Sequence, residues 1–268
     1  MPLNKHVRTV VLLAMAICVL LPFLLLVMRA FTGYWMYSDI IPDMSIGNLI
    51  RFIEADDIRK LLVNSITLSA LVTLVSAVIG LLPAKYLGTK AFKGKTLLYI
   101  FLLIPAVTPG ICIMFGLIEV QIKLGIYRQY ISLVLCQAAF TTPYFIFVMM
   151  PVFKRFETQL EEQSAVLGVG KLSTLLNVTL PAVKTGLATS MMLTFVISWS
   201  MYLVTSACAP RGFETMATRL LPQISYGYAF DSYVSSLALL FLIPAILSLV
   251  ISTLVIGSDK VNARRQKA

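Results

Sequence analysis

Six long stretches without a charged residue constrain this sequence more than any other feature. They cover residues 9–28, 61–84, 96–118, 129–153, 185–210 and 232–258, and each is about 20 residues or longer. An α-helix rises 1.5 Å per residue, so about 20 residues cross the roughly 30 Å hydrocarbon core of a bilayer. The chain is 59% hydrophobic and only 13% charged. A soluble domain usually carries about twice that share of charge, so a soluble fold is excluded.

The sequence therefore predicts an all-α integral membrane protein that forms a single domain over residues 1–268. A cleaved signal peptide is an alternative for the first segment, because Lys5 and Arg8 precede it. Its apolar run is longer than the 7–15 residues of a signal peptide, and no small-x-small cleavage site follows Met28. We expect an uncleaved first helix. The six transmembrane helices are predicted at about 9–31, 61–86, 96–118, 129–153, 183–210 and 232–257.

Charge is distributed unevenly between the connections. The two ends and the connections after the second and fourth segments carry fourteen Lys and Arg and four acidic residues. The remaining connections carry eight of each. The positive-inside rule predicts that the basic side, with both termini, faces the cytoplasm. The net charge of +10 therefore indicates topology and contact with anionic membrane lipid, and no nucleic-acid partner is expected.

Prolines interrupt several of the predicted helices. Residues 104–110 read IPAVTPG, so two prolines and a glycine follow one another in the third segment. Proline removes a backbone donor and kinks a helix. Such a kink serves either helix packing or a transport pathway. If it lines a pathway, Thr108 and Pro109 are candidate pathway residues. Thr142, directly before Pro143 in the fourth segment, raises the same two alternatives.

Few polar residues of the predicted helices are candidates for ion coupling, metal binding or solute binding. Ion-coupled carriers usually place Asp, Glu, Lys or Arg inside their helices, and all six segments lack these residues. Four cysteines, at positions 18, 112, 136 and 208, lie in apolar stretches without a CxxC pair, so we expect buried thiols and no metal site. Asn64-Ser65 is expected to cap the second helix, and Asp231 is either a cap of the sixth helix or a substrate ligand.

The connection between the fourth and fifth segments, about residues 154–182, is much longer than a turn requires. Apolar or small residues recur at helical spacing, which predicts an amphipathic helix over 154–167. Gly168 is expected to end it in a left-handed C-cap, and a second short helix follows at about 172–178. Such a hairpin could lie on lipid, but the acids of its first helix favour a protein partner. The stripe consists of Phe153, Phe156, Leu160, Ser164 and Leu167.

This connection resembles a known motif. Residues 160–168 read LEEQSAVLG, and Leu180-Pro181 follows with the proline thirteen residues after the glycine. The pattern is similar to the EAA loop of the membrane subunits of binding-protein-dependent ABC importers. The resemblance covers roughly residues 60–257. It is nearest to the short six-helix permeases of the polyamine, iron, thiamine and phosphonate importers, and Gln163 and Ser164 replace the usual two alanines.

The resemblance implies a type I importer permease fold in a bacterial inner membrane. The chain would pair with an identical or sister permease, with a dimer of ATPase subunits and with an extracytoplasmic solute-binding protein. Glu162 would contact a basic residue of the ATPase, Leu167 would pack in its groove and Gly168 would make the turn. ATP and Mg would be bound by the ATPase, so this chain needs no cofactor and is not itself an enzyme. The implied coupling residues are Leu160, Glu161, Glu162, Ser164, Leu167, Gly168 and Gly170.

The transported solute is expected to be small and polar. Trp199 and Tyr202, in the fifth segment, either offer aromatic faces to it or serve packing. Polyamine permeases often carry an acidic pair near this point, which this sequence lacks, so a polycation is not favoured over a neutral or anionic solute. An ion-coupled secondary transporter and a non-transporting membrane scaffold remain as alternative functions.

Overall fold

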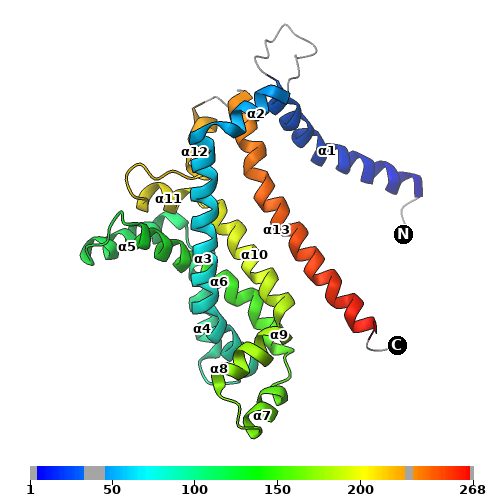
Figure 1. The fold of residues 1–268 in the computed structure, drawn as a ribbon, viewed down its shortest axis with the longest axis vertical. Coiled ribbons are helices and arrows are strands. Elements are labelled where there is room, and N and C mark those ends of the chain that lie inside the picture. Colours follow the sequence, from blue (N-terminus) through cyan, green and yellow to red (C-terminus); the bar gives the residue numbers. More distant parts are fainter. Residues whose placement is uncertain (1–4, 33–45, 227–231, 266–268) are drawn as a thin grey trace. The chain divides into compact units, whose positions relative to one another are not determined.

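The computed structural model describes residues 5–32, 46–226 and 232–265, and its elements are helices (Figure 1). The predicted all-α fold class is confirmed. In chain order the helices are α1 (Lys5–Phe31), α2 (Ile46–Glu54), α3 (Asp56–Thr89), α4 (Lys95–Val107), α5 (Gly110–Lys123), α6 (Tyr130–Lys154), α7 (Gln159–Val166), α8 (Lys171–Thr174), a π-helical turn (Leu175–Thr179), α9 (Leu180–Ala182), α10 (Lys184–Trp199), α11 (Tyr202–Cys208), α12 (Met216–Ser225) and α13 (Ser232–Arg265).

Length and composition mark candidate membrane spans among these helices. Within the described residues, α1, α3, α6 and α13 are each long and apolar enough to cross a bilayer. Two further pairs qualify as bent spans, with bends of 94° between α4 and α5 and 83° before α10. Counting each bent pair as one span gives up to six spans, the number that the sequence predicts, although the second pair joins residues 171–182 to α10 whereas the predicted fifth span is 183–210.

The chain forms two compact units. One comprises Met1–Val63 with Met216–Pro244, and the other comprises Asn64–Thr215 with Ala245–Ala268. In the first unit the start of α13 bonds to the end of α1. The Ser236 hydroxyl donates to the Ala30 carbonyl at 3.1 Å, and the Ser232 hydroxyl donates to the Arg29 carbonyl at 3.2 Å. The apolar side chains of α1 are mostly exposed, as suits a helix surrounded by lipid.

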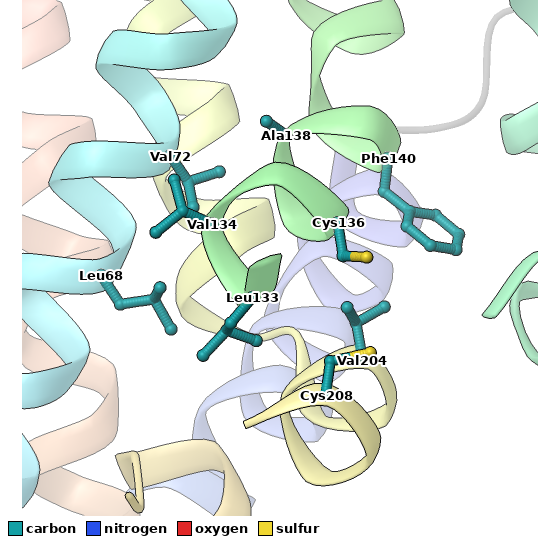
Figure 2. Close-up of a cluster of buried hydrophobic side chains, with 9 residues drawn as sticks. All are labelled: Leu68, Val72, Leu133, Val134, Cys136, Ala138, Phe140, Val204 and Cys208. Carbon is teal, nitrogen blue, oxygen red and sulfur yellow. The ribbon is translucent and has the colours of Figure 1, made fainter. Parts of the chain in front are cut away.

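Helix α6 is the centre of the second unit. It packs against α10, α11, α4 and α5, and the Thr141 and Ser76 hydroxyls join it to α3 at 2.8 Å. Figure 2 shows one apolar cluster around α6, with side chains from α3, α6 and α11. A second cluster lies toward the loop between α6 and α10 and comprises Ala84, Leu87, Phe145, Ile146, Met149, Phe153 and Val183.

Two predicted helices are interrupted. The kink expected at IPAVTPG is confirmed, because α4 ends at Val107 and α5 begins at Gly110 at a steep angle. The prediction of one continuous helix over 183–210 is wrong. Helix α10 ends at Trp199, Met201 takes an extended conformation with ψ 90°, and α11 follows. No proline or glycine lies at this break, so no local signal predicts it.

Smaller predictions also need correction. Asn64 does not cap a helix, because α3 begins at Asp56 and the Asn64 side-chain amide instead donates to the Glu214 carbonyl at 3.0 Å. Cys136 and Cys208 are buried as expected, but Cys18 and Cys112 are exposed on apolar helices, where lipid rather than protein surrounds an apolar side chain. Asp231 lies outside the described residues.

Candidate functional site

The connection between α6 and α10 folds into a compact knob, here defined as residues 155–182. Helix α6 ends at Lys154, and the amides of Arg155 and Phe156 bond back to the carbonyls of Val152 and Phe153 at 3.1 and 3.2 Å. The Phe156 ring then packs edge-on against Phe153 at 6.2 Å. The predicted continuous helix over 154–167 is therefore wrong, because this turn separates α6 from α7.

Helix α7 has an inner and an outer side. Ser164 is buried, and its hydroxyl donates to the Leu160 carbonyl at 3.0 Å. Leu160 is 38% exposed. Val166 and Leu167 project outward with 89% and 81% of their surface exposed, so Leu167 does not continue the predicted inner stripe. An apolar tip of this kind is a surface that a protein partner can cover.

The turn after α7 is fixed by backbone hydrogen bonds. The Gly168 amide donates to the Ala165 carbonyl and the Val169 amide donates to the Ser164 carbonyl, both at 3.0 Å. This pairing is a Schellman motif, which needs a left-handed residue at the first position after the C-cap. Gly168 supplies it with φ 77°, so the predicted glycine C-cap is confirmed. The knob therefore holds its tip in a defined orientation.

The second half of the knob is less regular than predicted. Gly170 precedes α8 with φ −66° and ψ 152°, values that any residue can adopt. In place of a regular helix over 172–178, the chain forms the four-residue α8 and then the wider π-helical turn. After α9 the chain bends at Val183, where φ is −108° and ψ is 11°, and enters α10.

The two adjacent glutamates of α7 face different surroundings. Glu162 is exposed. Glu161 points inward and accepts hydrogen bonds from the Lys85 ammonium at 2.7 Å and from the Thr179 hydroxyl. Partial burial acts to raise the pKa of Glu161, but these two hydrogen bonds and the charges of Lys85 and Lys90 outweigh it and lower the pKa. Glu161 therefore stays ionised at neutral pH.

The predicted pathway residues of the third and fourth segments lie near the proline bends. Thr108 ends α4 with its amide bonded to the Ile104 carbonyl at 2.9 Å, and Pro109 opens α5. Thr142 is bonded through its hydroxyl to the Ala138 carbonyl at 2.7 Å. Thr142 lines a largely apolar groove of about 360 Å³ between α3, α4 and α6, formed by Ile79, Phe101, Leu102, Pro105, Leu135, Ala138, Ala139, Thr142 and Pro143.

The predicted aromatic pair flanks the break between α10 and α11. Trp199 is only 2% exposed and stacks on Phe195 with ring centroids 6.1 Å apart, which is a packing role. Tyr202, the first residue of α11, is partly exposed. Of the two, Tyr202 is the one with surface left for a solute.

A buried glutamine that sequence reasoning missed spans the same break. Gln137 of α6 is fully buried. Its amide nitrogen donates to the Thr205 hydroxyl of α11 at 2.7 Å, and its amide oxygen accepts from the Ser198 hydroxyl of α10 at 2.5 Å. The one signal in the sequence was a large amide inside an otherwise apolar segment, since such residues join membrane helices. A second amide, that of Gln121, contacts the sulfur atoms of Cys136 and Cys208, which Figure 2 shows on α6 and α11.

Comparison with known proteins places this architecture in a family. Residues 76–268 match the sequence pattern of the family described as "Binding-protein-dependent transport system inner membrane component". The chain belongs to this family. Its members are the multi-pass inner-membrane subunits of ABC importers, so the resemblance read from the sequence is confirmed. This chain is a permease subunit, and the ATPase domain that its family lacks belongs to another subunit.

Individual relatives of this permease are distant. The inner membrane ABC transporter permease protein YcjP of Escherichia coli (strain K12) is 24% identical over 201 residues, or 71% of this chain and 70% of that protein. The spermidine/putrescine permease PotC of Haemophilus influenzae (strain ATCC 51907 / DSM 11121 / KW20 / Rd) is 22% identical over 76% of this chain and 79% of its own length. The polyamine permeases are thus relatives, but only distant ones.

A solved structure supports the same fold. A bacterial ABC transporter involved in import of the acidic polysaccharide alginate contains a chain that superposes with a TM-score of 0.73. The superposition covers 94% of this chain and 99% of that one at 15% sequence identity. A likeness at this identity concerns the fold alone.

Proposed function

We propose that the knob is the surface through which this permease couples to the ATPase subunit of its importer. The observation that carries the proposal is the apolar tip formed by Val166 and Leu167, which is exposed yet held by the Schellman motif at Gly168. A rigid projection can transmit a rigid-body movement, whereas a loose loop would absorb it. Exposed Glu162 next to this tip offers a carboxylate to a basic residue of the ATPase.

The remaining partners follow from the same proposal. We expect two ATPase subunits, which bind ATP and Mg, a second permease that is identical or a sister chain, and a solute-binding protein on the opposite side of the membrane. The basic connections and both termini would face the ATPase subunits, as the charge distribution predicts.

The solute is proposed to be small and polar, without selection by an intramembrane charge. All six apolar segments lack Asp, Glu, Lys and Arg. Similar proteins are named for different solutes, spermidine and putrescine in one case and an acidic polysaccharide in another. Membership of the family therefore does not identify the solute of this permease. The pathway is proposed to run past Thr108, Pro109, Thr142 and Tyr202, with Trp199 behind it as a packing residue.

Affinity purification of the tagged full chain from native membranes in mild detergent tests the docking proposal. Partners are identified by mass spectrometry, with and without ATP and vanadate to trap the assembly. We expect an ATPase subunit to co-purify, and Glu162→Lys to lower its recovery by about tenfold or more, because a reversed charge opposes the basic contact.

Glu119→Lys provides the matched control. Glu119 is an exposed acid outside the knob, in α5, where it pairs with Lys123 at 2.7 Å. Its reversal should leave ATPase recovery unchanged. Equal recovery in wild type and Glu162→Lys, or absence of an ATPase even after trapping, would contradict the proposed docking surface.

A further inference from the structure

Glu161 is held inside the chain, although it lies next to the glutamate that we assign to ATPase docking. Its Oε1 atom accepts from Lys85 Nζ at 2.7 Å and from the Thr179 hydroxyl. The Lys85 and Glu161 side chains are 26% and 21% exposed, and Thr179 is fully buried. This ion pair is therefore shielded from solvent far better than a surface pair, and it holds its geometry through a third group.

The three bonded residues come from three different segments. Lys85 lies one turn before the end of α3, a candidate membrane span. Glu161 lies in the first turn of α7, and Thr179 ends the π-helical turn that precedes α9 and α10. Lys85 and Glu161 are 76 residues apart in sequence, and Thr179 is 18 residues from Glu161. One carboxylate oxygen thus joins both halves of the knob to a span that is not its neighbour in the chain.

The position of this contact matters for movement. Backbone continuity already links the knob to α6 and α10, the two helices on either side of it. It does not link the knob to α3. Among the described residues, the contact of Glu161 with Lys85 is an ion pair between α7 and α3, so it supplies a connection that the chain path does not.

We propose that Glu161 is a positioning residue that transmits displacement of α7 to α3 through Lys85 and Thr179. This inference rests on the proposed docking of the knob on the ATPase. When the ATPase subunits move the apolar tip, the ion pair carries α3 along with it. Without the ion pair the knob still docks and moves, but α3 no longer follows, and ATP is hydrolysed without the full rearrangement of the spans.

Hydrogen exchange read by mass spectrometry tests this in the complete importer, reconstituted in lipid. The probe is ATP with Mg and orthovanadate, so no solute is needed. In the wild type we expect trapping to change exchange both in peptides over 159–170 and in peptides over 80–92. In Glu161→Gln the change over 159–170 persists, while the change over 80–92 falls by about threefold or more.

Two further variants separate transmission from simple loss of structure. The exchange of partners in Lys85→Glu with Glu161→Lys restores an ion pair and should restore most of the response over 80–92. Glu119→Gln removes an exposed charge of α5, outside the knob, and should behave as wild type. ATPase recovery and the melting temperature of Glu161→Gln are measured in parallel.

Each result decides the matter. An unchanged response over 80–92 in Glu161→Gln, or no such response in the wild type, would overturn the inference. Loss of the ATPase from Glu161→Gln that the exchanged pair does not repair would also overturn it and would assign Glu161 to the docking surface. Failure of the docking proposal is distinct, because wild-type peptides over 159–170 would then show no response to trapping.

Discussion

Gly186 of α10 lies directly against Val152 of α6. A Cβ atom built on Gly186 would be 2.5 Å from Val152 Cγ2 and 2.7 Å from Cγ1. Real Cβ atoms do not approach other atoms this closely, so the two helices can pack here only because position 186 has no side chain. The contact lies two residues before the end of α6 and two residues after the start of α10, next to the knob.

Gly186→Ala should therefore destabilise the permease. Overpacking of this kind costs about 1–3 kcal/mol. We expect a lower melting temperature in detergent, and recovery of most of the loss when Val152→Ala is combined with it. Gly116→Ala is the control, since nothing lies within 4 Å of that position in α5. A melting temperature of Gly186→Ala equal to that of Gly116→Ala would show that the helices are not in close contact.

Gly168 and Gly170 form a matched pair for testing the knob. Nothing lies within 4 Å of either Cβ position, so steric clash is absent at both. Gly168 has φ 77°, where an alanine costs about 1–2 kcal/mol, whereas Gly170 has an ordinary φ of −66°. Gly168→Ala should reduce recovery of the ATPase several-fold, and Gly168→Pro should abolish it without affecting membrane insertion. Gly170→Ala should have no effect. Equal recovery in all three variants would mean that the fixed turn is irrelevant to docking.

Gln137 gives a prediction about the broken fifth span. Gln137→Met removes the bonds to Ser198 and Thr205 and preserves the volume of the side chain. Hydrogen bonds between membrane helices average about 0.6 kcal/mol, so the loss should be about 1 kcal/mol, or a melting temperature lower by about 2–4 °C. Gln129→Met, which removes an exposed bond to the Gly125 carbonyl, should leave the melting temperature unchanged. The bridge would be disproved by equal melting of the two variants.

The lowered pKa of Glu161 predicts a pH dependence of stability. The pKa of the Glu161 carboxyl in the folded state lies below its usual value of 4.5. Such a group stabilises the fold fully at pH values above 4.5, the pKa of the unfolded state. The contribution is lost as the pH falls through the lower, folded-state pKa. The difference in melting temperature between wild type and Glu161→Gln should thus stay constant from neutral pH down to about pH 5 and shrink at lower pH. A difference that instead grows on acidification would exclude the ion pair with Lys85.

Sequence and structure agree where the signal is local. The prolines at 105 and 109 predicted the bend between α4 and α5, and Gly168 predicted the end of α7, because both residue types act on their own backbone. The resemblance to the EAA loop places both adjacent glutamates, Glu161 and Glu162, at the contact with the ATPase. Their separation into an inner and an outer residue depends on Lys85 and Thr179, which a linear pattern does not bring together.

The prediction of one continuous helix over 183–210 is wrong for the same reason, because the contacts around the break between α10 and α11 are not local in sequence. Residues 198–202 contain neither proline nor glycine, and the partner that joins the two helices, Gln137, precedes Ser198 by 61 residues. The prediction of buried thiols is wrong at Cys18 and Cys112, where lipid rather than protein surrounds the side chain. Apolarity alone does not distinguish the two environments.

The apolar tip of the knob has a consequence for how the cell makes this protein. If the ATPase docks on this tip as proposed, Val166 and Leu167, which are exposed in the subunit alone, stay uncovered in a newly inserted subunit until the ATPase binds. Exposed aliphatic side chains on a turn at the membrane surface are what chaperones and membrane proteases bind. An excess of this subunit over its partners should therefore be short-lived, and its steady-state abundance should follow the supply of the ATPase rather than its own rate of synthesis.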